Sequence, residues 1–289
     1  MASSADTLKR AMAWVMHRLS RRAFLFTTVG TATTIIGGCA WATSPKGTPD
    51  PLNGFVQSGV DTQGGPARLT SRLPNRSLPT FEAKPGLRAL QLGPAGRQVL
   101  LHVPPGLAEG PPAVLVLTLH GAGGNAPAGL APLRPLADAY RLLLLAPTAQ
   151  GSTWDAVTSS WGPDIGRIDQ ALAEVFTSYR VDSKRLVVSG FSDGASYALS
   201  MGLANGDLFT HIIAFSPGFV VPGPRVGTPA IYISHGRDDA VLPIERTTRR
   251  ISPWLRKSGY PVVVHEFDGS HTVPPAIVED AVRWVSGGP

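Results

Sequence analysis

The feature that most constrains this chain is the G-x-S-x-G motif at residues 190–194, which reads Gly-Phe-Ser-Asp-Gly. Residues 185–189 before it form an apolar, β-branched run that predicts a buried parallel strand. Residues 195–201 after it are small or straight-chained and favour a helix. Glycines on either side of a serine allow a strained turn, which exposes the hydroxyl at a helix N-terminus. We therefore predict that Ser192 is a nucleophile; the alternative is a structural turn.

Composition and charge limit the class of protein. The chain has 289 residues, of which 43% are hydrophobic and 16% charged, and this is typical of a globular α/β domain. The formal charge is +6, but five basic residues and one acidic residue precede Cys39, which leaves only +2 for the remainder. That remainder has no basic run, so we expect no nucleic-acid partner.

The first 38 residues predict an export signal. Residues 20–25 read Ser-Arg-Arg-Ala-Phe-Leu and resemble the twin-arginine motif, and a weakly apolar segment over 23–38 comes next. This segment has 16 residues, five of them threonine, and is too short and polar for a permanent membrane span. We expect export from a bacterial cytoplasm to a periplasmic or extracellular location.

Two processing outcomes stay open at the end of this leader. Residues 36–39 read Ile-Gly-Gly-Cys and resemble a bacterial lipobox, in which Cys39 would be lipidated and would attach the protein to a membrane. Residues 40–42 read Ala-Trp-Ala and offer a competing cleavage site that releases a soluble product. Cys39 is the only cysteine, so the mature domain has no disulfide and no cysteine-based metal site.

Beyond the leader, the sequence predicts a spacer and then one domain. Residues 39–85 are rich in proline and glycine and predict a tether, or alternatively a partly ordered arm lying on the domain. Over residues 86–289 strand and helix patterns alternate, which predicts a single α/β domain whose mostly parallel sheet carries helices on both faces. We expect strands at 87–92, 98–103, 113–119, 142–146, 185–189, 211–215, 230–234 and 262–267, the first two as an edge hairpin, and helices at 131–140, 164–179, 195–201, 243–259 and 274–286.

A serine nucleophile needs a histidine base that is oriented by a carboxylate. In an open α/β sheet these partners lie on loops after later strands. His271 lies on the loop after the last expected strand, and we predict that it is the base. His120 and His235 end strands, so we expect them to brace loops.

The acid and the oxyanion donors come after other strands. Asp238 and Asp239 both come after the strand that ends at residue 234 and compete for the role of acid, with Asp239 favoured. Acyl transfer also needs two N–H donors for an oxyanion. The glycine-rich stretch 119–125 offers Ala122, and the residue after the nucleophile offers Asp193. No phosphate-binding G-x-x-x-x-G-K-[ST] motif, dinucleotide fingerprint or metal-ligand spacing is present, so we expect no cofactor and no metal.

These motifs together resemble the phospholipase/carboxylesterase branch of the α/β-hydrolase superfamily, near bacterial predicted esterases and polyhydroxybutyrate-depolymerase-like proteins. The matching pieces are 119–124, 190–194, 235–239 through Pro243, and 269–271. The resemblance covers about residues 86–289 and implies a serine carboxylesterase that works through an acyl-enzyme. It also implies Asp239 as the acid, because the family's acid is the fifth residue of the His-Gly loop. Ala195 departs from the second glycine that these esterases often have.

The surroundings of the site suggest the substrate class. Only residues 216–228 lie where many lipases insert a lid, so we expect no large lid and an open site for short-chain or aromatic esters. Phe219 and Trp154 are candidate substrate-binding walls, although Trp154 fits equally well as a core residue. A polyester depolymerase and a thioesterase remain alternatives within enzymes. The alternative outside enzymes is an inactive, surface-anchored binding protein on the same fold, and no protein partner is evident.

Overall fold

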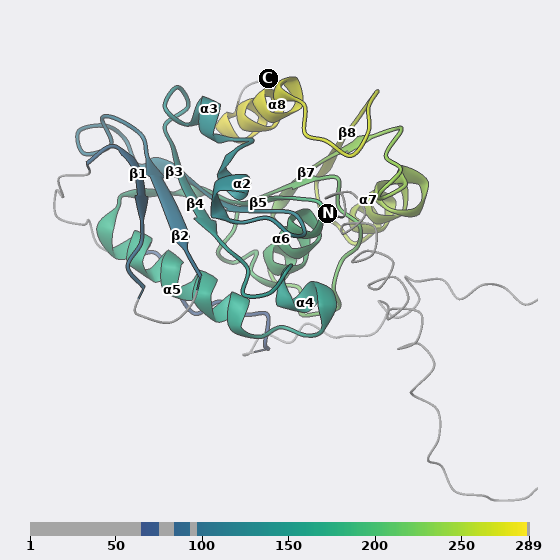
Figure 1. Ribbon diagram of the computed structural model, residues 1–289, viewed down its shortest axis with the longest axis horizontal. Coiled ribbons are helices and arrows are strands. Elements are labelled where there is room, and N and C mark those ends of the chain that lie inside the picture. The colour runs from purple at the N-terminus through teal and green to yellow at the C-terminus, as the bar shows by residue number, and fades with distance from the viewer. Residues whose placement is uncertain (1–64, 75–83, 93–96, 288–289) are drawn as a thin grey trace, which may run out of the picture. The chain divides into compact units, whose positions relative to one another are not determined.

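Eight strands form one sheet in the order β1-β2-β4-β3-β5-β6-β7-β8 (Figure 1). The computed structural model describes residues 65–74, 84–92 and 97–287, so the predicted leader and Cys39 lie outside the described residues. The strands are β1 (Gly86–Ala89), β2 (Val99–Val103), β3 (Ala113–Leu119), β4 (Leu142–Pro147), β5 (Val181–Phe191), β6 (His211–Phe215), β7 (Ala230–Gly236) and β8 (Val262–Phe267).

The sheet is parallel except at the β1 end. β1 pairs with β2 and β2 with β4 in the antiparallel sense, and every other neighbouring pair is parallel. The central strand β3 is buried at every position, as an apolar strand covered on both faces must be. The prediction of a mostly parallel α/β sheet is confirmed. One detail was wrong: β2 lies between β1 and β4, and only β1 is an edge strand of the hairpin.

Helices cover both faces of this sheet, with α2, α3 and α8 above it and α4 and α5 below it in Figure 1. The bounds are α2 (Ala126–Leu130), α3 (Arg134–Ala137), α4 (Asp155–Thr158), α5 (Pro163–Ser178), α6 (Asp193–Ala204), α7 (Thr248–Lys257) and α8 (Pro275–Ser286), with a 3₁₀ turn η2 (Ile244–Arg246). Of the helix expected at 131–140, only the four residues of α3 are helical, and α2 is a separate short helix just before this range. The helix expected at 243–259 divides at Thr247, whose backbone leaves the helical region.

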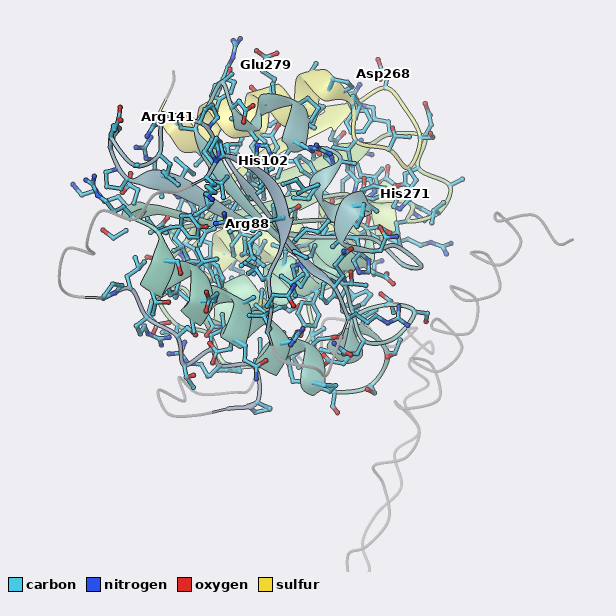
Figure 2. The ribbon with its side chains drawn as sticks, turned by 60° about the vertical axis from the view of Figure 1, so that its left-hand side comes forward. Arg88, His102, Arg141, Asp268, His271 and Glu279 are labelled. Carbon is cyan, nitrogen blue, oxygen red and sulfur yellow. The ribbon has the colours of Figure 1, made fainter. Side chains whose placement is uncertain are left out.

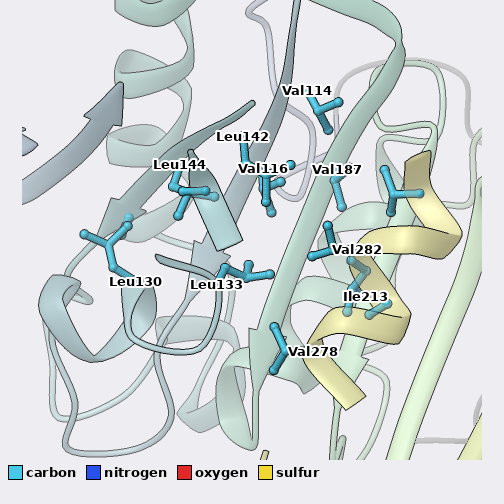
Figure 3. Packing of buried hydrophobic residues seen from close by; sticks show 14 of the residues in the cluster. Val114, Val116, Leu130, Leu133, Leu142, Leu144, Val187, Ile213, Val278 and Val282 are labelled. Carbon is cyan, nitrogen blue, oxygen red and sulfur yellow. The ribbon is translucent and has the colours of Figure 1, made fainter. Parts of the chain in front are cut away.

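The core on the upper face joins strands that are distant in sequence. Val116, Leu144 and Val187 project from β3, β4 and β5 against Leu130 of α2 and Val282 of α8 (Figure 3). All five are at most 3% exposed. Burial of such side chains stabilises the fold by roughly 1.5–3 kcal/mol each, and it fixes the sheet edge from which the site loops project.

Part of the expected tether packs on the domain. Ala67 and Leu69 are buried, at 0% and 2% exposure. The Asn205 side chain at the end of α6 donates to the Ala67 carbonyl and accepts from the Leu69 N–H, both at 2.8 Å. Arg68 forms an ion pair with Asp207 at 2.7 Å. Residues 65–74 are therefore an arm on the domain, the alternative that the sequence left open.

We predict that Asn205→Ala lowers the free energy of unfolding by about 2 kcal/mol, because it leaves two buried backbone groups of the arm unpaired. Urea unfolding measures the change. Thr177→Ala on the exposed side of α5 is the control and should cost under about 0.5 kcal/mol. Equal effects of the two substitutions would show that Asn205 does not hold the arm.

Candidate active site

Ser192 occupies a strained turn between β5 and α6. Its φ of 58° and ψ of −120° are values that residues other than glycine rarely adopt. A Cβ atom at Gly190 would lie 2.1 Å from the Gly194 carbonyl oxygen, and one at Gly194 would lie 2.3 Å from that of Leu119. Both flanking positions therefore require glycine, and the turn expected from the motif is present.

The structure brings together the three residues expected to form a triad. His271 Nε2 lies 2.9 Å from Ser192 Oγ, and His271 Nδ1 lies 2.6 Å from Asp239 Oδ2. The three residues come after β5, β7 and β8, so the carboxyl ends of parallel strands collect them at one edge. Ser192 and Asp239 are buried, and His271, labelled in Figure 2, is half-buried. Asp238 is exposed, and Asp239 alone of the two competing aspartates contacts His271.

The Asp239 carboxylate accepts hydrogen bonds at both oxygens. Oδ1 accepts from the Val241 and Leu242 N–H groups at 2.9 and 2.8 Å. Oδ2 accepts from His271 and lies 3.1 Å from His235 Nε2. Burial alone would raise the pKa of Asp239, but the bonds from His235, His271 and Leu242 outweigh it and hold that pKa well below its usual range. An ionised Asp239 keeps the proton of His271 on Nδ1, which leaves Nε2 free to accept one.

Sequence reasoning missed the contact between His235 and the acid. The His235 side chain is fully buried, and its Nε2 also lies 2.8 Å from the Leu242 carbonyl oxygen. Its Nδ1 lies 2.8 Å from Thr248 Oγ1 at the start of α7. His235 therefore braces a loop, as expected, and the braced loop carries Asp239. The available signal was its position four residues before the acid at the end of β7.

The two expected oxyanion donors are free to act. Within the described parts of the chain, neither the Ala122 nor the Asp193 N–H donates to a backbone or side-chain acceptor. A Cβ atom built on Gly121 would lie 3.4 Å from Ser192 Cβ, so the stretch 119–125, here the oxyanion loop, lies against Ser192. Asp193 opens α6, whose N-terminus favours negative charge.

The expectation that Trp154 lines a substrate pocket is wrong. Its side chain is only 1% exposed, and its indole N–H donates to the His120 carbonyl at 2.9 Å. The Trp154 ring lies 4.8 Å from that of His120 and 5.2 Å from that of Tyr197. Trp154 is therefore a core residue, the alternative that the sequence left open. Phe219 is half-buried, and its contact with a substrate stays a prediction.

A small pocket of about 210 Å³ borders the oxyanion loop. Gly121 and Ala122 form one side of it, and Phe191, Phe215 and Pro132 contribute apolar walls. Phe191 also contacts His271, with ring centroids 4.7 Å apart. Phe191, which precedes Ser192 in the chain, thus lines the pocket and also contacts His271.

A parallel sheet that presents a serine at an elbow, with histidine and aspartate from later loops, defines the α/β-hydrolase class of fold and site. Residues 164–286 match the family model described as Phospholipase/Carboxylesterase. Over these residues the chain is similar to the phospholipase/carboxylesterase family, which belongs to the α/β-hydrolase superfamily. The resemblance seen in the motifs is confirmed.

Two relatives are named as esterases, and one solved structure with the same fold is named as a serine hydrolase. The chain is 25% identical over 172 residues to feruloyl esterase C of Emericella nidulans, a match covering 57% of this chain and 63% of that one. It is 27% identical over 132 residues to probable acetylxylan esterase A of Neosartorya fischeri, covering 43% and 35%. The chain thus spans less than two thirds of either relative. The Staphylococcus aureus fluorophosphonate-binding serine hydrolase F shares the fold, with a TM-score of 0.56, 15% identity, and coverage of 70% of this chain and 99% of that one.

The low pKa of Asp239 predicts a pH-dependent contribution to stability. We expect Asp239→Asn to lower the free energy of unfolding by about 3 kcal/mol at pH 7, because it disrupts buried charge-assisted hydrogen bonds. The pKa of Asp239 is lower in the folded protein than in the unfolded chain, where it is about 4. The ionised carboxylate therefore stabilises the folded state fully above about pH 4, and this stabilisation is lost as the pH falls further toward the folded pKa. The gap between wild type and variant should therefore shrink below about pH 4 in urea titrations.

Asp238→Asn is the matched control, because Asp238 is exposed and neighbours Asp239 in the same loop. It should change the free energy of unfolding by under about 0.5 kcal/mol. A larger effect of Asp238→Asn than of Asp239→Asn would contradict the assignment of the acid.

Proposed function

We propose that the protein is a serine carboxylesterase that hydrolyses its substrate through an acyl-enzyme. The observation that carries this proposal is the continuous hydrogen-bonded path from Ser192 Oγ through His271 to Asp239. It begins at a strained elbow beside two unused backbone N–H groups. The match of residues 164–286 to the phospholipase/carboxylesterase family model supports the same reaction.

In the proposed reaction, Ser192 Oγ attacks the ester carbonyl carbon and transfers its proton to His271 Nε2. The carbonyl oxygen becomes an oxyanion, which the Ala122 and Asp193 N–H groups and the N-terminus of α6 stabilise. The carbon–oxygen bond to the alcohol then breaks, and the alcohol leaves with the proton from His271. Water, deprotonated by His271, then attacks the acyl carbon, the bond from that carbon to Ser192 Oγ breaks, and Oγ takes the proton back from His271 as the acid leaves. Asp239 stays ionised throughout and stabilises the imidazolium.

Short-chain or aromatic esters fit the surroundings of the site best. The segment between β6 and β7, residues 216–229, contains no helix. The Gly218 and Val221 N–H groups donate to the Ser196 and Ser200 hydroxyls of α6 at 2.9 and 2.8 Å. These bonds hold the segment against α6, so it is unsuited to act as a mobile lid. Each acyl methylene gains about 0.8 kcal/mol only where an apolar wall continues, and the pocket beside the oxyanion loop is small. The feruloyl and acetyl groups in the relatives' names are an aromatic and a two-carbon acyl group.

A panel of p-nitrophenyl esters from C2 to C16, with a phenolic-acid ester, a thioester and a polyester film, tests this proposal. Short or aromatic esters should be turned over fastest, without a jump above the micellar concentration. Ser192→Ala and His271→Ala should each lower kcat by about 10⁴ or more, and the double variant should lose little further. If Ser192→Ala retained activity within tenfold of wild type, Ser192 would not be the nucleophile. A rate that rises steadily with acyl-chain length up to C16 would exclude the proposed preference for short-chain or aromatic esters. A wild-type protein that is folded but inactive on every substrate would favour a binding protein.

We also propose that the protein is exported and that Cys39 sets its final state. The support is the twin-arginine-like leader and the lipobox-like residues 36–39. With lipidation, the mature protein should partition with membranes, and Cys39→Ala should release it or block processing. Mass spectrometry of the mature N-terminus measures this, and an unlipidated start at Thr43 would refute the anchor.

A further inference from the structure

The loop between β4 and α4, residues 148–154, contacts both segments that carry the expected oxyanion donors; we refer to it as the β4–α4 loop. On the oxyanion-loop side, the Ala149 N–H donates to His120 Nε2 at 3.0 Å. The Gly123 N–H donates to the Ser152 carbonyl at 2.6 Å. The buried indole N–H of Trp154 donates to the His120 carbonyl at 2.9 Å. Three hydrogen bonds thus join the two loops.

These bonds set the tautomer of His120. Because Nε2 accepts from Ala149, the ring proton is on Nδ1, and Nδ1 donates to the Gly121 carbonyl at 2.7 Å. Burial lowers the pKa of His120, which agrees with a neutral ring. The Gly121 carbonyl belongs to the same peptide group as the Ala122 N–H, and in a trans peptide the two point in opposite directions. Fixing the Gly121 carbonyl therefore orients the Ala122 N–H.

The same loop also reaches the elbow. The Thr153 hydroxyl donates to Asp193 Oδ2 at 2.8 Å, and both side chains are buried. Asp193 is the residue whose own N–H is the second expected donor. Thr153 and Trp154 are adjacent in sequence, so one short stretch is bonded to both halves of the expected oxyanion hole.

We propose that the β4–α4 loop, through Thr153 and Trp154, positions both backbone donors of the oxyanion hole. The two side chains are positioning residues, because each acts through a neighbour and neither touches the reacting atoms. This inference rests on the proposed esterase function. A looser loop should weaken stabilisation of the transition state and leave substrate binding unchanged, so kcat should fall and KM should not.

Two conservative substitutions in the full chain test the proposal. Trp154→Phe keeps a ring and removes the indole N–H, and Thr153→Val keeps the shape and removes the hydroxyl. With p-nitrophenyl acetate each should lower kcat by about tenfold, less than the 10²–10³ for loss of a donor itself, with KM within about twofold. Thr153→Ser retains the hydroxyl and should recover most of the wild-type kcat. The matched controls are Trp284→Phe on α8 and Thr177→Val on α5, which lie on other elements and should leave kcat unchanged.

Inhibition by an aryl trifluoromethyl ketone separates positioning from a general structural role. Ser192 Oγ bonds to the ketone carbon, its proton passes to His271, and the resulting oxyanion occupies the hole. The inhibition constant of each variant should rise by the same factor as kcat falls, whereas a general loss of folded protein would leave it unchanged. Thermal unfolding shows whether each variant is folded. If Trp154→Phe does not fold, the comparison of Thr153→Val with Thr153→Ser tests the proposal on its own.

The outcomes also separate this inference from the proposed function. One outcome would overturn only the role of the β4–α4 loop and leave the proposed function intact. In that outcome the wild type is active, Ser192→Ala is inactive, and the Thr153 and Trp154 variants have the same kcat as their controls. An unchanged inhibition constant in slow variants would also overturn only that role. Turnover by Ser192→Ala close to that of wild type would overturn the proposed function and, with it, this inference.

Discussion

The structure depends on the close approach of α6 to the end of β3 at the strained Ser192 turn. Gly194 leaves no room for a side chain beside the Leu119 carbonyl, and Ser192 holds a positive φ. Such a residue costs roughly 1–3 kcal/mol and persists only where the surroundings determine it. The Ser192 N–H donates to the Phe215 carbonyl at 2.9 Å, which fastens the turn to β6. The buried central strands therefore maintain the strained turn that places the Ser192 hydroxyl beside His271.

Local pattern and sheet topology were enough to predict from the sequence the central strands and the proximity of Ser192, Asp239 and His271. Uniformly apolar runs such as 113–119 identified the central strands, and β3 has the predicted bounds. Because carboxyl ends of parallel strands meet at one edge, Ser192, Asp239 and His271 were expected together although 79 residues separate the first from the last. These predictions needed only the type of each element and its order.

Features that depend on a distant partner were beyond prediction. Trp154 was ambiguous because the acceptor of its indole N–H is a carbonyl 34 residues away. The arm at 65–74 has no apolar period, and the Asn205 side chain that holds Leu69 is 136 residues distant. The shortening of the helix expected at 131–140 to α3, and the division of 243–259 at Thr247, reflect backbone geometry that helix propensity does not report.

Support for the two parts of the proposed chemistry comes from different elements. Asp239, which orients the proposed base, is held by His235 and by the loop that leads to α7. The expected oxyanion donors are held by the loop after β4, and β4 and β7 lie on opposite sides of β5 in the sheet. Errors of about 0.5 Å in either part are enough to impair a site of this kind. The two supports share no residue. Substitutions around Asp239 should therefore alter proton transfer, whereas substitutions in the β4–α4 loop should alter stabilisation of the oxyanion. The elbow at Ser192 is the one element on which both depend.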